Sequence, residues 1–417
     1  MIEFESYTLG NGLTVLLHHD PDRTVATVNV LYKVGSRNDP PHRTGFAHLF
    51  EHLMFAGSEN VPNFDDALQL AGGENNALTS SDYTLYYDTL PAENLETALW
   101  LESDRMRKLR FSERSLANEK RVVIEEFRET CLEQPYGDLY HHLNGLIYLE
   151  HPYRWPVIGQ DIEHIRKATL GEVRDFYYRY YRPDNAILCI AGRFDPATIR
   201  ERIAHWFGSI PPSDAGRPRP SIPPEPPQEA RRHLRVTGDV PSPVIYLHYR
   251  TVDRLHADFP ATDILSFLLG GGRSSRLYRR LVRDTEIFAE VSAGINDNLD
   301  DGGIIVEARP SEDVDYATAR AALHAAITEL VDRGITRGEL DKVVNRLEQR
   351  NHYREANIGT RANELVLFAL LGQPDLINTE LDRYLELTEA DINRVAREYL
   401  RPERCVELEY LSDASGS

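Results

Sequence analysis

Cysteine is scarce in this chain of 417 residues: the three present, Cys131, Cys189 and Cys405, lie far apart and form no CxxC pair. This pattern is typical of free, buried thiols and excludes a disulfide framework or a thiolate zinc site. Basic charge is also in short supply, because 47 Lys and Arg face 66 Asp and Glu, for a net charge of −19. The resulting field repels phosphate and anionic lipid, so nucleic acid and membrane are not expected as partners.

Long hydrophobic runs are lacking as well. No uninterrupted apolar stretch approaches the ~20 residues that a membrane-spanning helix needs. The first five residues, MIEFE, carry acids where a signal peptide needs Lys or Arg, and no apolar run of about 7–15 residues follows them. We therefore expect the chain as printed to be cytoplasmic, with the periplasm as the alternative if an export signal has been removed.

Proline, by contrast, is concentrated in one place. The composition is that of an ordinary folded protein, 41% hydrophobic and 27% charged, with length for two or three domains of ~100–200 residues. Eight of the 24 prolines lie between Ile210 and Arg232, a density typical of an extended linker. We predict an N-terminal domain at 1–212, a linker at 213–230 and a C-terminal domain at 231–417.

The two halves contain similar successions of elements, which indicates an internal duplication. Alternating apolar residues predict strands, and 3.6-residue spacing predicts helices. The corresponding segments are a strand (25–32 and 244–249), an amphipathic helix (92–106 and 316–331) and a charged helix (112–130 and 337–353). A further strand at 185–192 and a helix from Asp195 to about Phe207 complete the first domain. The predicted fold class is α+β, with two similar domains of mixed sheets and helices.

The motif that carries chemistry is His48-Leu49-Phe50-Glu51-His52, which reads HxxEH. On a helical wheel its two histidines and its glutamate share the face opposite an apolar stripe. We expect a helix capped by Thr44 and ended by Gly57. Histidines at i and i+4 can both reach one Zn²⁺ at ~2.0–2.1 Å, and Glu51 shares their face. The order is the reverse of the zincin motif HExxH.

A catalytic zinc held by two histidines needs one more protein ligand, commonly a carboxylate. The helix at 112–130 offers five glutamates: Glu113, Glu119, Glu125, Glu126 and Glu129. Glu119 and Glu126 are seven residues apart and so lie on one stripe of the helix. Spacing alone does not choose between Glu125 and Glu126 as the ligand.

The segment HLFEH at 48–52, followed by EKRVVIEE at 119–126, resembles the pitrilysin-type (M16) inverzincin zinc peptidases, in particular the processing-peptidase subfamily. The resemblance spans nearly the whole chain and implies two homologous domains that form a clamshell around a chamber, with one Zn²⁺ per chain. It implies Glu126, 74 residues after His52, as the third ligand and Glu119 as a supporting catalytic carboxylate. It also implies that Asn76, Ala77 and Leu78 contact peptide substrates by strand addition.

This resemblance implies a zinc-dependent metalloendopeptidase that hydrolyses peptides or unfolded polypeptide segments. Zinc supplies a Lewis acid that acidifies water, and Glu51 is expected to accept the proton of the attacking water as general base. The alternative is a structural or assembly subunit, related to processing peptidases, with little activity alone. Inactive relatives usually have eroded ligands, so the complete motif here favours the enzyme.

One position departs from the family pattern. Relatives carry an Arg, followed seven residues later by a Tyr, that hold the substrate and the oxyanion. Arg283 matches the Arg, but Glu290 stands at the Tyr position. A carboxylate cannot donate a hydrogen bond as a phenol does, and it repels a developing oxyanion. We therefore expect a dimer, either a homodimer or a heterodimer in which a partner subunit carries the Arg/Tyr pair.

Overall fold

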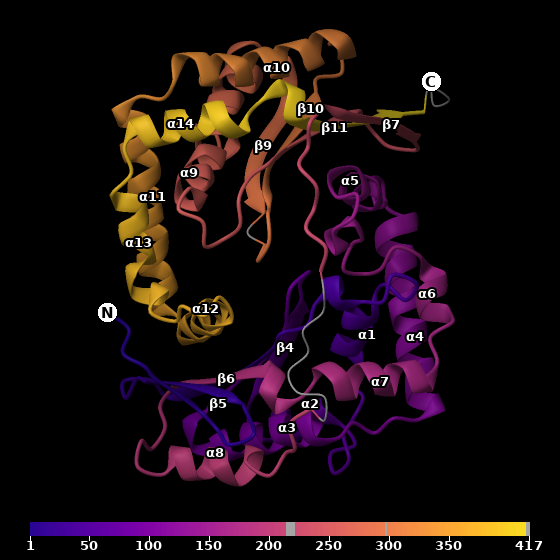
Figure 1. Ribbon diagram of the computed structural model, residues 1–417, viewed down its shortest axis with the longest axis vertical. Helices are drawn as coiled ribbons and strands as arrows, with labels where there is room; N and C mark the ends of the chain where they lie inside the picture. Colours follow the sequence, from indigo (N-terminus) through magenta and orange to yellow (C-terminus); the bar gives the residue numbers. More distant parts are fainter. Residues whose placement is uncertain (214–221, 297, 414–417) are drawn as a thin grey trace. The chain divides into compact units, whose positions relative to one another are not determined.

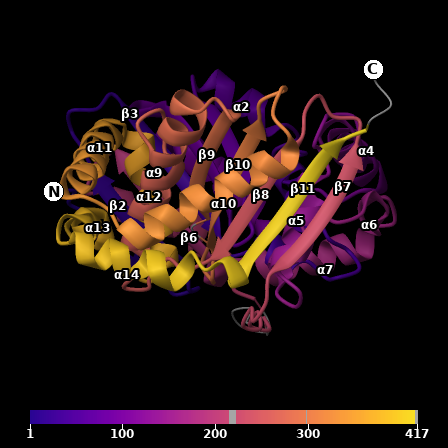
Figure 2. The same ribbon diagram turned by 90° about the horizontal axis from the view of Figure 1, so that it is seen from above.

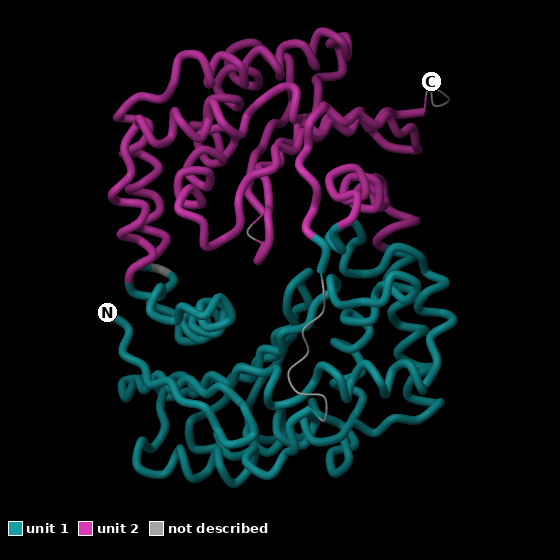
Figure 3. Tube along the Cα trace, viewed as in Figure 1, with its two compact units in different colours: residues 1–129, 151–223, 352–378 teal, residues 130–150, 224–351, 379–417 magenta. Residues whose placement is uncertain are grey.

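The protein forms two units in the computed structural model, which describes residues 1–213, 222–296 and 298–413. Unit 1 consists of residues 1–129, 151–223 and 352–378, and unit 2 of residues 130–150, 224–351 and 379–417 (Figure 3). Each unit therefore takes one segment from the opposite half of the chain, whereas the boundaries predicted from the sequence follow the chain without exchange. Of the predicted linker 213–230, residues 214–221 lie outside the described part, and 222–230 contain no helix or strand.

Unit 1 is built on a six-stranded mixed sheet with the order β1-β2-β6-β3-β5-β4. Strands β2 and β6 pair in parallel, and the other neighbours are antiparallel. The strands are β1 (Glu5–Thr8), β2 (Thr14–His19), β3 (Val25–Tyr32), β4 (Glu74–Thr79), β5 (Thr84–Pro91) and β6 (Ala186–Gly192). The strands predicted at 25–32 and 185–192 are thus confirmed as β3 and β6, and β4 lies at one edge of the sheet.

Helices cover both faces of this sheet (Figure 1). Along β3, Val28 and Val30 point into the larger core, and Leu31 points into the smaller core beneath α12 (Ile358–Leu370). The larger core contains side chains of α1 (Phe46–Leu53), α2 (Phe64–Leu70), α3 (Leu95–Arg107), α4 (Glu113–Phe127), α6 (Ile162–Arg166), α7 (Leu170–Tyr180) and α8 (Ile199–Phe207). Helix α8 begins four residues later than the start predicted at Asp195, because residues 195–198 form a turn.

Unit 2 repeats the plan with five strands in the order β7-β11-β8-β10-β9. The strands are β7 (Arg232–Gly238), β8 (Val244–Arg250), β9 (Phe288–Asn296), β10 (Gly303–Pro310) and β11 (Cys405–Ser412). The order matches β2-β6-β3-β5-β4 of unit 1, and the first pair is again parallel. The predicted α+β class with two similar mixed sheets is confirmed, whereas a chamber between the units stays a prediction.

The helices of unit 2 pack on both sides of its sheet. They include α9 (Phe259–Gly270), α10 (Tyr316–Arg333), α11 (Arg337–Ala356), α13 (Leu376–Leu385) and α14 (Glu389–Tyr399), with α5 (Leu139–Ile147) against β7 and β11. Figure 2 shows α10 lying across the sheet, where its apolar residues join the core of the unit. Helix α9 follows β8 as α1 follows β3, but its sequence FPATDILSFLLG contains no His or Glu and is almost entirely buried. None of the described helices is both long enough and apolar enough to span a membrane.

Candidate metal centre

Helix α1 carries the HxxEH motif, and a carboxylate from the preceding loop holds its N-terminus. Gly45 is the N-cap residue with φ of 90°, a left-handed conformation that favours glycine. Asp39 accepts hydrogen bonds from the backbone N–H of Gly45 at 2.7 Å and of Ala47 at 2.9 Å. The Thr44 hydroxyl contacts His164 Nδ1 instead, at 2.8 Å. The predicted Thr44 cap is therefore wrong, because buried Asp39 satisfies the free N–H groups in its place.

One face of α1 is buried in the core and the other carries the residues of the motif, as the helical wheel predicted. Five residues of the helix are buried: Phe46, Ala47, Leu49, Phe50 and Leu53. His48, Glu51 and His52 are half-buried on the other side. The rings of His48 and His52 lie with their centroids 5.0 Å apart and their planes at 89°. The short helix thus presents two imidazoles and a carboxylate on one face.

Helix α4 packs against α1 and brings a second carboxylate to the histidines. The Oε1 atom of Glu126 lies 3.5 Å from Nε2 of His48, and its Oε2 atom lies 3.3 Å from Nε2 of His52. One ligand atom from each of the three residues falls within 4.8 Å of the others. Two nitrogens and one oxygen suit Zn²⁺, and three protein ligands leave an open position of the kind that catalytic zinc sites keep. The residues present therefore fit a zinc ion.

The neighbouring glutamate faces elsewhere. Glu125 is 53% exposed in its side chain and pairs with Arg128 at 2.8 Å, one turn further along the chain. Successive residues of a helix point about 100° apart, so only one of the two glutamates can face α1. The structure brings Glu126, and not Glu125, to the histidines.

Charge and burial shift the pKa values of the histidines and glutamates at this site. The hydrogen bond with Glu126 raises the pKa of His52, and the same bond lowers the pKa of the Glu126 carboxyl. Burial lowers the pKa of His48, because its charged form is poorly solvated. Burial raises the pKa of the Glu119 carboxyl, and the charge of nearby His52 opposes that shift. Glu119 thus lies close enough to His52 for their charges to interact.

Glu51 has a partner that the sequence interpretation missed. The hydroxyl of Thr79, the last residue of β4, donates a hydrogen bond of 2.6 Å to Glu51 Oε2. Burial alternates along β4, which places Asn75, Ala77 and Thr79 on the same side of the strand. The sequence ENNALT shows no matching alternation of apolar and polar residues, so only the structure shows that Thr79 lies on the side of β4 that faces α1.

The predicted substrate-contacting residues lie in β4. Among the described strands β4 pairs only with β5, which leaves its other edge without a partner strand. Asn76 and Leu78 are exposed, and Ala77 is half-buried. The side-chain oxygen of Asn76 accepts a hydrogen bond from the N–H of Ala77 at 2.8 Å. An extended peptide could add to an edge of this kind.

The remaining predicted residue, Arg283, belongs to unit 2. Its exposed side chain pairs with the adjacent Asp284 at 2.6 Å. Glu290 lies in β9 opposite Arg309, whose Nε atom is 3.7 Å from the glutamate carboxylate. Arg283 and Glu290 thus both lie in unit 2, whereas the HxxEH helix belongs to unit 1.

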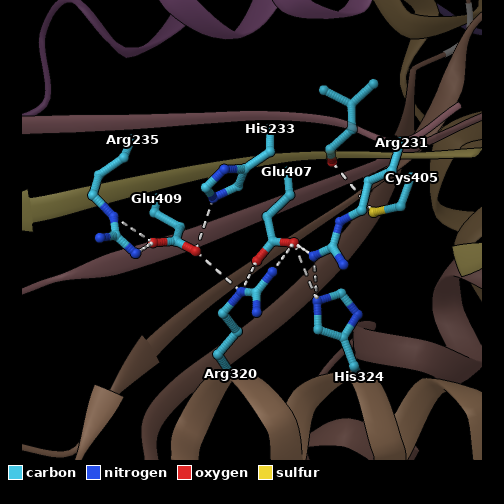
Figure 4. A network of polar contacts seen from close by, with 9 residues as sticks. Arg231, His233, Arg235, Arg320, His324, Cys405, Glu407 and Glu409 are labelled. Atoms are coloured by element: carbon cyan, nitrogen blue, oxygen red, sulfur yellow. Dashed lines mark hydrogen bonds and ion pairs between the residues drawn. The ribbon is translucent and has the colours of Figure 1, made fainter. Parts of the chain in front are cut away.

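Unit 2 contains a second group of metal-type side chains, His233, Glu407 and Glu409. Both glutamates are buried, and cationic side chains surround their oxygens (Figure 4). Glu407 pairs with Arg231, with Arg320 at 2.5 Å and with His324 at 3.3 Å, and Glu409 pairs with His233 at 2.9 Å, Arg235 at 2.7 Å and Arg320 at 3.0 Å. A metal ion would have to displace these arginines, so this group is a salt-bridge network.

A HxxEH helix that meets a glutamate from a second helix, within a repeated α+β fold, is typical of inverzincin peptidases. Comparison of the sequence with models of known protein families agrees with this classification. Residues 14–152 match the model for Insulinase (Peptidase family M16), and residues 167–347 match the model for the Peptidase M16 inactive domain. The chain belongs to peptidase family M16.

Relatives extend this result over the whole chain. The chain is 34% identical to "Zinc protease PqqE" of Helicobacter pylori over 406 residues, which cover 95% of this chain and 90% of that protein. It is 29% identical to the mitochondrial-processing peptidase subunit beta of Saccharomyces cerevisiae over 52% of this chain and 47% of that protein. The crystal structure of a protease from Helicobacter pylori has a TM-score of 0.93 at 30% identity and covers 99% of this chain and 100% of that one.

Proposed function

We propose that the protein is a zinc-dependent metalloendopeptidase that hydrolyses peptides or unfolded polypeptide segments. The observation that carries this proposal is the convergence of His48, His52 and Glu126, whose ligand atoms lie within 4.8 Å of one another. We assign these three residues as the ligands of one Zn²⁺ per chain. The name of the Helicobacter pylori relative, a zinc protease, supports the assignment.

Glutamate side chains of the chain itself would carry out the proton transfers of peptide hydrolysis. When bound, zinc supplies a Lewis acid that acidifies water and polarises a peptide carbonyl. Glu51, on the same face of α1 as the two histidines, accepts the proton of the attacking water and delivers it to the leaving amine. Its Oε2 atom is held by Thr79, which leaves its other oxygen for this transfer. Glu119 supports the site through its charge interaction with His52.

The peptide would bind along β4. The open edge of this strand offers backbone groups to an extended chain, with Asn76, Ala77 and Leu78 as contacts. We further propose that Arg283 contributes to substrate binding, as in the family pattern. Glu290 in place of a tyrosine favours a dimer, in which a partner subunit supplies the Arg/Tyr pair. The match to a protein named as a subunit, the yeast processing peptidase beta chain, favours a heterodimer.

A second candidate function is that of a structural or assembly subunit with little activity alone. Glu290, exposed on β9 and near Arg309, is the observation that favours it, because a carboxylate there cannot stabilise an oxyanion. The intact group of three ligands and the base Glu51 favours the peptidase, since a purely structural subunit has no use for these side chains.

The test is digestion of unfolded peptides by the purified chain, alone and with a candidate partner subunit that carries the Arg/Tyr pair, after metal analysis of each sample. A zinc peptidase contains stoichiometric zinc and cleaves peptides in a way that chelator stops and zinc restores. Cleavage only with the partner supports the heterodimer, and full cleavage by the chain alone contradicts the need for a partner. Zinc-free protein that stays inactive in both samples favours the structural subunit.

A further inference from the structure

The contact between Thr79 and Glu51 joins the edge strand β4 to the HxxEH helix. The distance from Thr79 Oγ1 to Glu51 Oε2 is 2.6 Å. A carboxylate only accepts hydrogen bonds, so the threonine hydroxyl is the donor. Charge-assisted O–H···O bonds are typically ~2.5–2.7 Å long and stronger than neutral ones. The contact is therefore a directed bond to one of the two oxygens of Glu51.

The backbone around Thr79 is fixed on both sides. Thr79 lies opposite Thr84 in the β4–β5 pair, and the Thr84 hydroxyl is buried and bonded to the carbonyl of Val34. The next residue, Ser80, closes the turn through N–H to Tyr83 O at 2.8 Å and accepts a bond from Ser36 N–H at 3.1 Å. A β-branched side chain has few χ1 rotamers, so a fixed backbone also fixes the hydroxyl.

Glu51, in contrast, is a half-buried side chain with three rotatable bonds. Without a partner such a carboxylate samples several rotamers, and only some of them aim an oxygen at the reacting group. Proton transfer requires the base within hydrogen-bond reach of the proton that it takes. A fixed donor on Oε2 therefore restricts the orientation of the whole carboxylate.

We propose that Thr79 is a positioning residue, which orients the Glu51 carboxylate for proton transfer by holding its Oε2 atom. This inference rests on the proposed function, in which Glu51 is the general base. Thr79 is also the last residue of β4, the strand along which we propose that the peptide binds. One side chain thus connects the peptide-binding edge to the base.

The experiment compares three variants of the full chain, each loaded with zinc and assayed with the partner subunit if activity requires it. Thr79→Val keeps the shape of the side chain and removes the hydroxyl, and Thr79→Ser keeps the hydroxyl. The matched control is Thr251→Val, because the buried hydroxyl of Thr251 has no hydrogen-bond partner in the described part of the chain. Readouts are kcat, KM, bound zinc and the crystallographic orientation of Glu51.

We expect Thr79→Val to lower kcat about 10- to 100-fold, the scale of a misplaced catalytic group, with KM and bound zinc as in the unmodified chain. Thr79→Ser should restore most of kcat, and Thr251→Val should leave it unchanged. Crystal structures should show Glu51 in one orientation in Thr79→Ser and in several orientations in Thr79→Val.

The inference is overturned if Thr79→Val retains kcat, if Thr79→Ser is as slow as Thr79→Val, or if Glu51 keeps one orientation without the hydroxyl. Loss of zinc or a rise in KM with unchanged kcat also contradicts it, since either result marks a structural or binding role. If the unmodified zinc-loaded chain cleaves no peptide either alone or with the partner subunit, the proposed function fails, and the orientation of Glu51 in the crystal structures still decides whether Thr79 holds it.

Discussion

The carboxylate of Glu126 lies 3.3 Å from Nε2 of His52, although the two residues are separated by a large part of unit 1. Helices α1 and α4 pack side by side. This packing brings Glu126 to His52 and also places its other carboxylate oxygen 3.5 Å from Nε2 of His48. A histidine and a carboxylate so placed can hold a proton between them or share a metal ion. Metal binding would displace that proton, because zinc ligands must be deprotonated.

Replacing Glu126 tests whether it is the third ligand. We expect Glu126→Gln to lose most bound zinc on dialysis, because an uncharged amide is a poor substitute for a carboxylate ligand. Glu125→Gln is the matched control: it changes the adjacent residue, which pairs with Arg128, and should keep its zinc. Metal analysis of both variants checks this, and equal zinc contents would refute the assignment.

Replacing Glu51 distinguishes the role of a general base from that of a metal ligand. Glu51→Gln should keep zinc and lose about 10²- to 10⁴-fold in kcat, the usual contribution of a general base. His48→Ala, in contrast, should lose the metal itself. Exposed Glu133→Gln serves as control and should retain both zinc and turnover. Normal cleavage by Glu51→Gln would remove Glu51 from the mechanism.

Asp39 should support the metal centre through the N-terminus of α1. Asp39→Ala removes the acceptor for the N–H groups of Gly45 and Ala47, and loss of a helix cap lowers the free energy of unfolding by about 0.5–2 kcal/mol. The histidines lie within the first two turns, so zinc should also bind more weakly. Denaturant unfolding and zinc titration measure the two effects.

The control for this variant is Asp315→Ala, which removes the side-chain cap of α10 in unit 2. It should lower stability by a similar amount and leave zinc affinity unchanged. If both variants bind zinc as tightly as the unmodified chain, Asp39 has only a general stabilising role.

His248 should make unit 2 sensitive to acid. Its ring is buried, neither nitrogen has a hydrogen-bond partner among the described residues, and burial lowers its pKa from 6.5 to about 3. Between those values the unfolded chain binds a proton that the folded chain does not. Stability therefore falls as pH falls through this range, by up to about 1.4 kcal/mol per pH unit.

His248→Gln removes this proton uptake. The free energy of unfolding, measured by urea titration between about pH 4 and pH 7, should then depend less steeply on pH. The decrease in slope should correspond to nearly one proton fewer taken up on unfolding. An unchanged slope would mean that His248 is protonated in the folded protein or that unit 2 does not unfold in the transition observed.

Much of the site was predictable from local periodicity. The wheel of residues 46–54 correctly placed the motif on the face opposite Phe46, Leu49 and Phe50, because a 3.6-residue repeat fixes which side chains share a face. The sequence-based boundaries, in contrast, missed the two segments, 130–150 and 352–378, that pack with the opposite unit. Such exchanges depend on long-range contacts, which residue order alone does not reveal.

The same limit explains the contacts that were missed. Asp39 caps α1 from six residues before Gly45, where no capping pattern applies. Thr79 reaches Glu51 only because α1 packs on that side of β4. The choice between Glu125 and Glu126 likewise needs the rotation of α4 about its axis, which spacing within one helix does not give.

The most direct test of the central claim is the position of the metal itself. Crystals of the zinc-loaded chain, measured at the zinc absorption edge, should give one anomalous peak per chain, ~2.0–2.2 Å from Nε2 of His48, Nε2 of His52 and a carboxylate oxygen of Glu126. A peak at His233, Glu407 and Glu409 instead, or no peak in zinc-saturated crystals, would contradict the account.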